Sequence, residues 1–320
     1  MDKIRDSADI LQPEKEETYQ FIEKLLSSVK ENFSTNRVHI GMDEAVMLGL
    51  GNYLKENGYK KGSLIIREHC NRVVDICRKL ELKPMIWSDM YITANSTGGY
   101  YDLPENTDCS KWEKPKKDLG LVYWDYYHDD TRTYEKMLDI HAQLSDNVIF
   151  AGGSWIWNGI SPNYSKTYAC TKAALSTCKK YNIKEALCTA WMDNGAETPV
   201  DALLPGLVLF AHLDFHRDYD ETILKQEFRN CTGGEFDDFM ALDNFDSLFL
   251  NTKENKEAQN PSKYLLYQDP MLGIFDYHVK ESGVNTKSYY QNIQKCMKEC
   301  AKKQENISFY SRFMKNWRRY

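Results

Sequence analysis

The sequence alternates short apolar stretches with longer amphipathic ones, and this alternation limits the fold more than any other feature. The apolar stretches predict five strands, at residues 37–41, 84–87, 119–124, 148–151 and 186–190. Apolar residues at helical spacing predict helices at 14–33, 63–81, 131–144, 165–181 and 200–213. Strands that are connected through helices pair in parallel. We therefore expect either a (β/α)8 TIM-type barrel or an open doubly wound sheet.

Polar or aromatic residues follow every predicted strand, which favours the barrel. The strand ends carry Asp43-Glu44, Trp87-Ser88-Asp89, Tyr123 to Tyr127, Trp155 with Trp157, and Trp191 with Asp193. A TIM barrel collects its site at the carboxyl ends of all its strands, whereas an open sheet binds ligands at one switch point. No G-x-G-x-x-G sequence follows a strand, which argues further against a dinucleotide-binding sheet.

A barrel of this type needs eight strands, and five are predicted. We therefore expect an α/β chain whose residues 1–217 form an incomplete (β/α)8 TIM-type barrel that lacks the first three βα units. Helical patterns at 218–231, 235–251 and 285–317 predict a helical carboxyl-terminal region over residues 218–320.

Composition and charge exclude several classes of protein. A net charge of −6 leaves no basic footprint for a nucleic acid, and no stretch reaches the roughly 20 apolar residues that span a bilayer. The amino terminus has no apolar segment of a signal peptide, and the nine cysteines include no C-x-x-C pair. We expect a cytoplasmic protein with reduced thiols and with no nucleic-acid or membrane partner, while homo-oligomerisation stays open. Cys296 and Cys300 have no histidine nearby, so we expect no metal site.

The residues from His39 to Glu44 carry the most specific signal for chemistry. Asp43 and Glu44 are adjacent acids at the end of a strand, where one can stay ionised while the other keeps its proton. Gly41 permits close approach of the backbone to a ligand. Taken alone, an adjacent acid pair also fits a helix cap or an exposed surface, so the other strand ends must be considered with it.

The pattern H-x-G-x-D-E of residues 39–44 resembles the signature of family 20 glycoside hydrolases, the β-N-acetylhexosaminidases. Residues 85–90 (MIWSDM) and 189–193 (TAWMD) are similar, in order and spacing, to the ends of later strands of that barrel. The resemblance covers about residues 30–215. Within the family, the chain looks most like the bacterial single-chain exo-hexosaminidases.

The resemblance implies retaining, substrate-assisted hydrolysis of a terminal, non-reducing β-linked N-acetylglucosamine or N-acetylgalactosamine, with no cofactor. The acetamido oxygen of the substrate would attack the anomeric carbon. Glu44 would protonate the leaving oxygen and later activate water, and Asp43 would orient the acetamido N–H and stabilise the positive charge. The expected partner is therefore an N-acetylhexosaminyl glycan, and the expected role lies in carbohydrate metabolism.

The resemblance also suggests residues that would bind the sugar. They are Trp87, Tyr126, Asp125, Trp157, Trp191, Asp193, Tyr123 and His39. Trp87, Trp157 and Trp191 would form walls around the ring and the acetamido methyl group. Ordinary packing at the barrel mouth is the alternative for each of them.

The polar candidates have specific alternatives. Asp193 would bind a sugar hydroxyl, or Glu197 in its place. Asp125 would bind another hydroxyl. His39 is expected either as a core histidine bonded to a carboxylate or, less favoured, as a substrate contact.

A tyrosine would donate a hydrogen bond to the acetamido oxygen, and Tyr123, Tyr126 and Tyr127 are candidates, with Tyr126 favoured. Residues 123, 125 and 127 share one face of the strand, and residues 124 and 126 share the other. The sequence does not determine which face points inward.

Two other hypotheses remain open. The chain could be an inactive, truncated remnant or a glycan-binding protein. Alternatively, it could be a different barrel glycosidase that uses Glu44 with a distant carboxylate such as Asp125 or Asp193.

Overall fold

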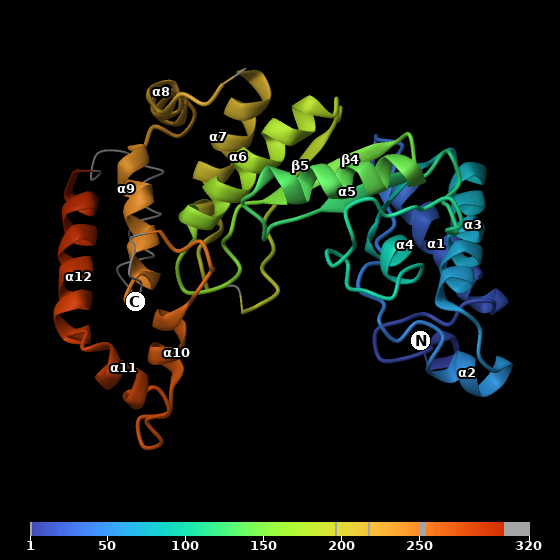
Figure 1. The fold of residues 1–320 in the computed structure, drawn as a ribbon, viewed down its shortest axis with the longest axis horizontal. Helices are drawn as coiled ribbons and strands as arrows, with labels where there is room; N and C mark the ends of the chain where they lie inside the picture. The colour runs from blue at the N-terminus through green and yellow to red at the C-terminus, as the bar shows by residue number, and fades with distance from the viewer. Residues whose placement is uncertain (1, 196, 217, 250–253, 304–320) are drawn as a thin grey trace. The chain divides into compact units, whose positions relative to one another are not determined.

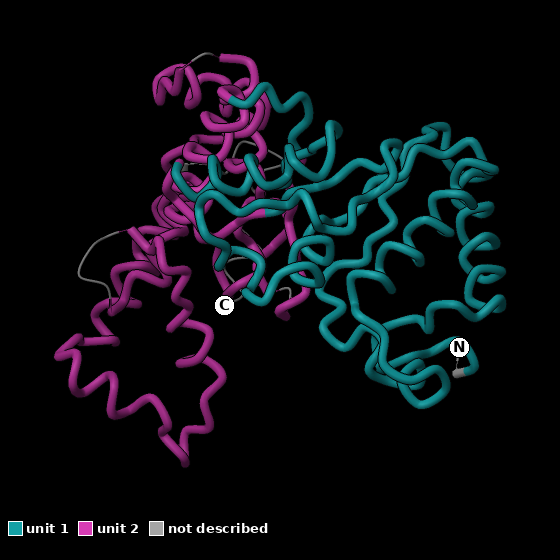
Figure 2. Tube along the Cα trace, turned by 45° about the vertical axis from the view of Figure 1, so that its right-hand side comes forward, with its two compact units in different colours: residues 1–124, 132–151, 181–186 teal, residues 125–131, 152–180, 187–320 magenta. Residues whose placement is uncertain are grey.

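A computed structural model describes residues 2–195, 197–216, 218–249 and 254–303 (Figure 1). The chain divides into two compact units, and the segments of the two units alternate along the sequence (Figure 2). Unit 1 comprises residues 1–124, 132–151 and 181–186, and unit 2 comprises residues 125–131, 152–180 and 187–320. The predicted boundary after residue 217 stays a prediction.

Within the described residues, five strands form one sheet in chain order. They are β1 (Arg37–His39), β2 (Lys83–Trp87), β3 (Gly120–Trp124), β4 (Val148–Gly153) and β5 (Ala186–Thr189). Each pair from β1 to β4 is parallel, with Val38 opposite Pro84, for example. The predicted fold class, an incomplete (β/α) barrel of the TIM type, is confirmed.

Helices and 3-10 turns form much of the rest of the described chain. They are α1 (Glu16–Asn32), α2 (Asn52–Asn57), α3 (Gly62–Lys79), α4 (Asp89–Thr93), α5 (Thr131–Leu144), α6 (Tyr164–Lys180), α7 (Leu204–Phe215), α8 (Glu221–Thr232), α9 (Phe236–Met240), α10 (Pro261–Tyr267), α11 (Asp276–Ser282) and α12 (Thr286–Lys303), with 3-10 turns η1 (Asp2–Ile4), η2 (Val200–Leu203) and η3 (Ala241–Asp246). Among the described residues, no helix is long and apolar enough to cross a membrane.

Several predicted helices differ from the observed ones. The helix expected at 235–251 is wrong as a single element, because α9 ends at Met240 and the chain tightens into η3. The helix expected at 285–317 is α12 as far as Lys303, and its remainder lies outside the described residues. The short helices α2, α10 and α11 were not predicted.

The amphipathic pattern of α1 and α3 produces one core of unit 1. Tyr19, Ile22 and Leu26 of α1 pack against Val73 and other apolar residues of α3. Removal of this apolar surface from water stabilises the pairing of the two helices. The Arg37 side chain at the start of β1 also forms an ion pair with Glu185, which precedes β5.

In unit 2, residues of η3 cap two helices that begin elsewhere in the chain. The Tyr164 N–H donates to Asp243 Oδ1 (2.8 Å) and the Ser165 N–H to Asp243 Oδ2 (3.1 Å), at the start of α6. The Ser262 N–H donates to Asp246 Oδ1 (2.9 Å) in the first turn of α10. The first N–H groups of a helix have no partner within the helix, so these two carboxylates satisfy donors that would otherwise be buried without one.

Candidate functional site

The chain leaves β1 through an unusual backbone conformation. The φ angle is +70° at Gly41, +71° at Met42 and +49° at Glu44. Residues other than glycine rarely adopt these left-handed backbone angles, and the resulting strain concentrates at functional sites. A Cβ on Gly41 would meet nothing within 4 Å, so glycine is favoured at this position by the backbone angle and not by crowding.

Asp89, at the end of β2, holds this loop through a hydrogen bond. The Glu44 N–H donates to Asp89 Oδ2 (2.8 Å), and the Trp124 indole N–H donates to Asp89 Oδ1 (3.2 Å). Asp89 is 3% exposed, and its burial raises the pKa of its carboxyl to about 6. The two donors oppose this rise, whereas the nearby charge of Asp43 adds to it. From the sequence alone, Asp89 is a polar residue at a strand end whose role, structural or in substrate contact, stays open.

Glu44, Asp89 and Trp124 line one groove in unit 1, with a volume of about 790 Å³. Val46 and Leu50 from the loop after β1, together with Tyr59 from the segment between α2 and α3, contribute an apolar wall. Asp43 and Glu44 are both exposed. The predicted proton donor therefore lies at the rim of a groove that is open to solvent.

His39 and Trp87 lie together at the ends of β1 and β2. Their ring centroids are 4.3 Å apart, and the Gly41 N–H donates to His39 Nδ1 (3.1 Å). The proton of the neutral ring is therefore on Nε2, which is buried and has no hydrogen-bond partner among the described residues. Burial lowers the pKa of His39, and the charge of Asp43 opposes this effect. The carboxylate partner expected for a core histidine is not found within the described part of the chain.

Unit 2 contains an aromatic cluster at the ends of β4 and β5. Trp155 and Trp157 are stacked with ring centroids 4.4 Å apart, and Tyr126 lies edge-on to Trp157 (5.6 Å) and Trp191 (6.3 Å). Trp155 donates its indole N–H to the Tyr126 carbonyl (2.8 Å). Trp155, Trp157 and Tyr126 are all buried. The structure thus brings three predicted sugar-binding residues, Tyr126, Trp157 and Trp191, into one cluster.

Asp125 and His128 form a hydrogen-bonded polar pair in unit 2. Asp125 Oδ1 accepts the N–H of Tyr127 (2.9 Å), and Asp125 Oδ2 lies 2.8 Å from His128 Nδ1. The hydrogen bond to Asp125 raises the pKa of His128, although burial opposes the rise. Sequence reasoning missed His128; its position three residues after Asp125 was the available signal.

The remaining predicted residues lie apart from these clusters. Tyr123 is fully buried in unit 1, with its ring 4.8 Å from His141 of α5 and 5.6 Å from Phe150 of β4. Asp193 is exposed in unit 2. Its alternative, Glu197, forms an ion pair with Lys263 of α10 (3.1 Å).

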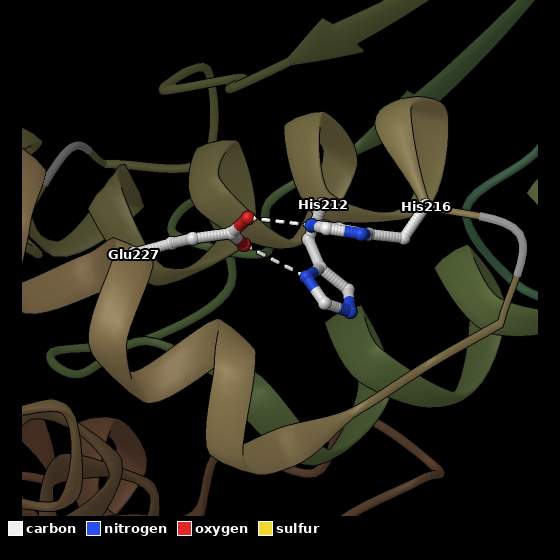
Figure 3. Close-up of side chains that lie close together, drawn as sticks. All are labelled: His212, His216 and Glu227. Atoms are coloured by element: carbon white, nitrogen blue, oxygen red, sulfur yellow. Dashed lines mark hydrogen bonds and ion pairs between the residues drawn. The ribbon is translucent and has the colours of Figure 1, made fainter.

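One group of side chains in unit 2 has the composition of a metal site. His212 and His216 lie one turn apart at the end of α7, and both contact the Glu227 carboxylate of α8 (Figure 3). His212 Nδ1 is 2.7 Å from Glu227 Oε2, and His216 Nε2 is 2.7 Å from Glu227 Oε1. Two histidines and a glutamate are ligands that Zn²⁺ accepts.

The hydrogen bonds of His212 nevertheless favour a bridge without metal. The Asp220 N–H donates to His212 Nε2 (3.1 Å), so the proton of the neutral ring is on Nδ1 and donates to Glu227. A metal on Nδ1 would move that proton to Nε2, where it would face the Asp220 N–H. Burial would raise the pKa of Glu227, but the hydrogen bonds from His216 and His212 lower it.

Two family models match the chain. Residues 2–130 match the family 20 glycosyl hydrolase catalytic domain, and residues 237–317 match the Glycoside Hydrolase 20C C-terminal domain. No curated protein matches. These matches define a glycoside hydrolase of the hexosaminidase type, whose family acts on glycans. Together the two matches support a hexosaminidase-like protein of glycoside hydrolase family 20 with a partial catalytic domain, and the predicted resemblance to that family is confirmed.

Proposed function

We propose that the chain removes terminal, non-reducing β-linked N-acetylglucosamine or N-acetylgalactosamine by retaining, substrate-assisted hydrolysis. The observation that carries this proposal is the placement of Glu44 at the rim of the groove of unit 1, next to Asp43 and on a backbone held by Asp89. A general acid needs a fixed position and access to the leaving oxygen, and the backbone bond to Asp89 and the exposure of the Glu44 side chain support this role.

In this mechanism the two adjacent acids have different tasks. Glu44 protonates the leaving oxygen, and its carboxylate then activates the water that completes hydrolysis. Asp43 accepts a hydrogen bond from the acetamido N–H, aligns the acetamido oxygen for attack on the anomeric carbon and stabilises the positive charge that forms. No nucleophile from the protein is required, and no metal or organic cofactor enters the scheme.

The aromatic residues support the same proposal. A ring such as Trp124, which lines the groove with Glu44, offers an apolar face to a pyranose. Tyr126, Trp157 and Trp191 remain candidates for the acetamido pocket, and Asp125, Asp193, Tyr123, Trp87 and His39 remain candidates for further contacts. All nine cysteines are free, which fits the cytoplasmic location that we propose.

Hydrolysis of 4-nitrophenyl β-N-acetylglucosaminide by the purified chain tests the proposal. We expect release of 4-nitrophenol that falls by about 10²–10⁴-fold in Glu44→Gln, the range for loss of a general acid. Glu31→Gln, on the exposed side of α1, is the matched control and should retain full activity. Equal turnover of the plain β-glucoside would contradict substrate assistance and favour a glycosidase with a separate carboxylate.

A second candidate function is glycan binding without hydrolysis, which the exposure of both Asp43 and Glu44 favours. A proton donor that is open to water loses part of the advantage of an enclosed site. Calorimetric titration with an N-acetylglucosamine oligosaccharide distinguishes the two functions. Binding with no product, in a folded chain, would support the second one.

A further inference from the structure

Asp89 connects the loop of the acid pair to an aromatic wall of the same groove. We propose that Asp89 is a positioning residue, which fixes the proton donor Glu44 relative to the ring of Trp124. This inference rests on the proposed function of Glu44 and extends it to a residue outside the acid pair.

The geometry assigns one carboxylate oxygen to each partner. Asp89 Oδ2 accepts the Glu44 backbone N–H (2.8 Å), and Asp89 Oδ1 accepts the Trp124 indole N–H (3.2 Å). Hydrogen bonds to a charged acceptor are stronger and more directional than those between neutral groups. A single buried side chain therefore fixes the positions of both the Glu44 backbone and the Trp124 ring.

Glu44 needs such an anchor because its backbone is strained. Its φ of +49° lies in the left-handed region, and a non-glycine residue stays there only when its surroundings hold it. The side chain itself is exposed, so the backbone contact to Asp89 determines where the carboxyl group can reach. Without that contact, Glu44 can relax and its carboxyl group can leave the reactive position.

Asp89 is in turn held from its other side. The preceding residue, Ser88, is fully buried, and its Oγ lies 2.8 Å from Tyr100 Oη and 2.7 Å from His141 Nε2. His141 Nδ1 donates to the Met137 carbonyl (2.6 Å), so Nε2 is the unprotonated nitrogen and accepts a hydrogen bond from the Ser88 hydroxyl. Burial lowers the pKa of His141 to about 4, which keeps this ring neutral and the network unchanged near neutral pH.

The ionisation of Asp89 is consistent with this role. Its two fixed donors both require an acceptor, and the ionised carboxylate is acceptor on both oxygens. Burial raises the pKa of Asp89 to about 6, so the group is ionised and accepts both bonds at neutral pH. Protonation below that pH would turn one oxygen into a donor that faces an N–H group.

Steady-state kinetics of Asp89→Asn test the proposal through the separation of kcat from KM. Asparagine keeps the size of the side chain but places an NH2 group against one of the two donors. We expect kcat to fall by about 10–100-fold, because small misplacement of a catalytic group has effects of that order, while KM changes by less than about threefold. Asp146→Asn, at an exposed loop position of the same unit, is the matched control.

A second measurement does not depend on activity. In ¹⁵N-labelled protein, we expect the Glu44 amide and the Trp124 indole N–H to titrate together with the same midpoint, and both titrations to disappear in Asp89→Asn. Trp124→Phe assigns the indole signal and should leave the Glu44 titration in place. Wild-type kcat in Asp89→Asn, or independent titrations of the two signals, would overturn the inference. A wild-type chain that hydrolyses nothing but shows the coupled titration would refute the proposed function and support the placement of Asp89.

Discussion

The two units, coloured separately in Figure 2, differ in the residues that they carry at the ends of their strands. In unit 1, Asp43 and Glu44 are exposed acids, and the backbone N–H of Glu44 donates to the buried carboxylate of Asp89. In unit 2, Tyr126, Trp155 and Trp157 are buried in contact with one another. Aromatic residues at a strand end serve packing as well as ligand binding, so the acid pair of unit 1 and the aromatic cluster of unit 2 require different tests. Substitutions should therefore alter activity in unit 1 and stability in unit 2.

Trp157→Ala should give the largest change in stability. If stability did not change, the contrast between the two units would not hold. Trp157 is buried and stacked on Trp155, so its removal leaves a cavity. We expect the free energy of unfolding to fall by about 3–5 kcal/mol, as for other buried tryptophans. Denaturant unfolding followed by circular dichroism measures this change. Full stability with lost sugar binding would instead make Trp157 a ligand residue.

Asp43→Asn should affect activity without affecting stability. Loss of the group that stabilises the developing charge is expected to lower kcat by about 10²–10³-fold, equivalent to about 2.7–4 kcal/mol. The side chain is exposed, so the unfolding temperature should stay within a degree or two of the wild type. Parallel kinetic and thermal measurements check both parts. A marked loss of stability would show that the acid pair has a structural task.

The pH dependence of stability sharpens the role of the buried carboxylate in unit 1. The folded-state pKa of Asp89, about 6, lies above its ordinary value of 3.8, so the folded state binds the proton more tightly. The stabilising contribution is therefore complete below about pH 4 and is lost as the pH rises through about 6, with a maximum of roughly 2–3 kcal/mol. Urea unfolding at several pH values should show this component in the wild type and not in Asp89→Asn. Identical pH profiles would contradict the assigned pKa.

Gly153→Ala should produce a smaller loss in unit 2. A Cβ on Gly153 would come within 2.9 Å of Trp157 and 3.1 Å of both Tyr126 and Thr189. Overpacking of this kind costs about 1–3 kcal/mol. Gly62→Ala in unit 1 is the matched control, because its Cβ would meet Ala94 at an ordinary 3.8 Å. Equal unfolding temperatures for the two variants would show that the aromatic cluster can rearrange.

The strands and long helices could be predicted because their periodicity is strong. The strand expected at 84–87 is Lys83–Trp87, and the one expected at 148–151 is Val148–Gly153. The helix α2 was missed because its stability comes from tertiary contact: Tyr53 is 2% exposed within a segment rich in glycine. The 3-10 turn η3 could not be predicted from the sequence either, because Asp243 and Asp246 cap helices that begin elsewhere in the chain.

The sequence was enough to propose the acid pair as a candidate site, whereas the residues that surround this candidate site could not be predicted from it. Strand alternation separates Tyr123 from Tyr126 but does not say which of them faces the helices, and the packing of Tyr123 against His141 provides that answer. The spacing of His212 and His216 is visible in the sequence. Their partner Glu227 comes from the next helix, and only the fold brings it to them.

The caps that η3 supplies have a consequence for how the chain can be divided. The Glycoside Hydrolase 20C C-terminal domain match begins at residue 237, yet Asp243, within that match, completes the first turn of α6, which begins at Tyr164. A recombinant protein that stops before residue 243 would therefore lose the hydrogen-bond acceptor for the first turn of a helix that begins some 80 residues earlier. The second matched segment is consequently not an independent module, and a chimera that exchanges it must keep the aspartate that caps α6.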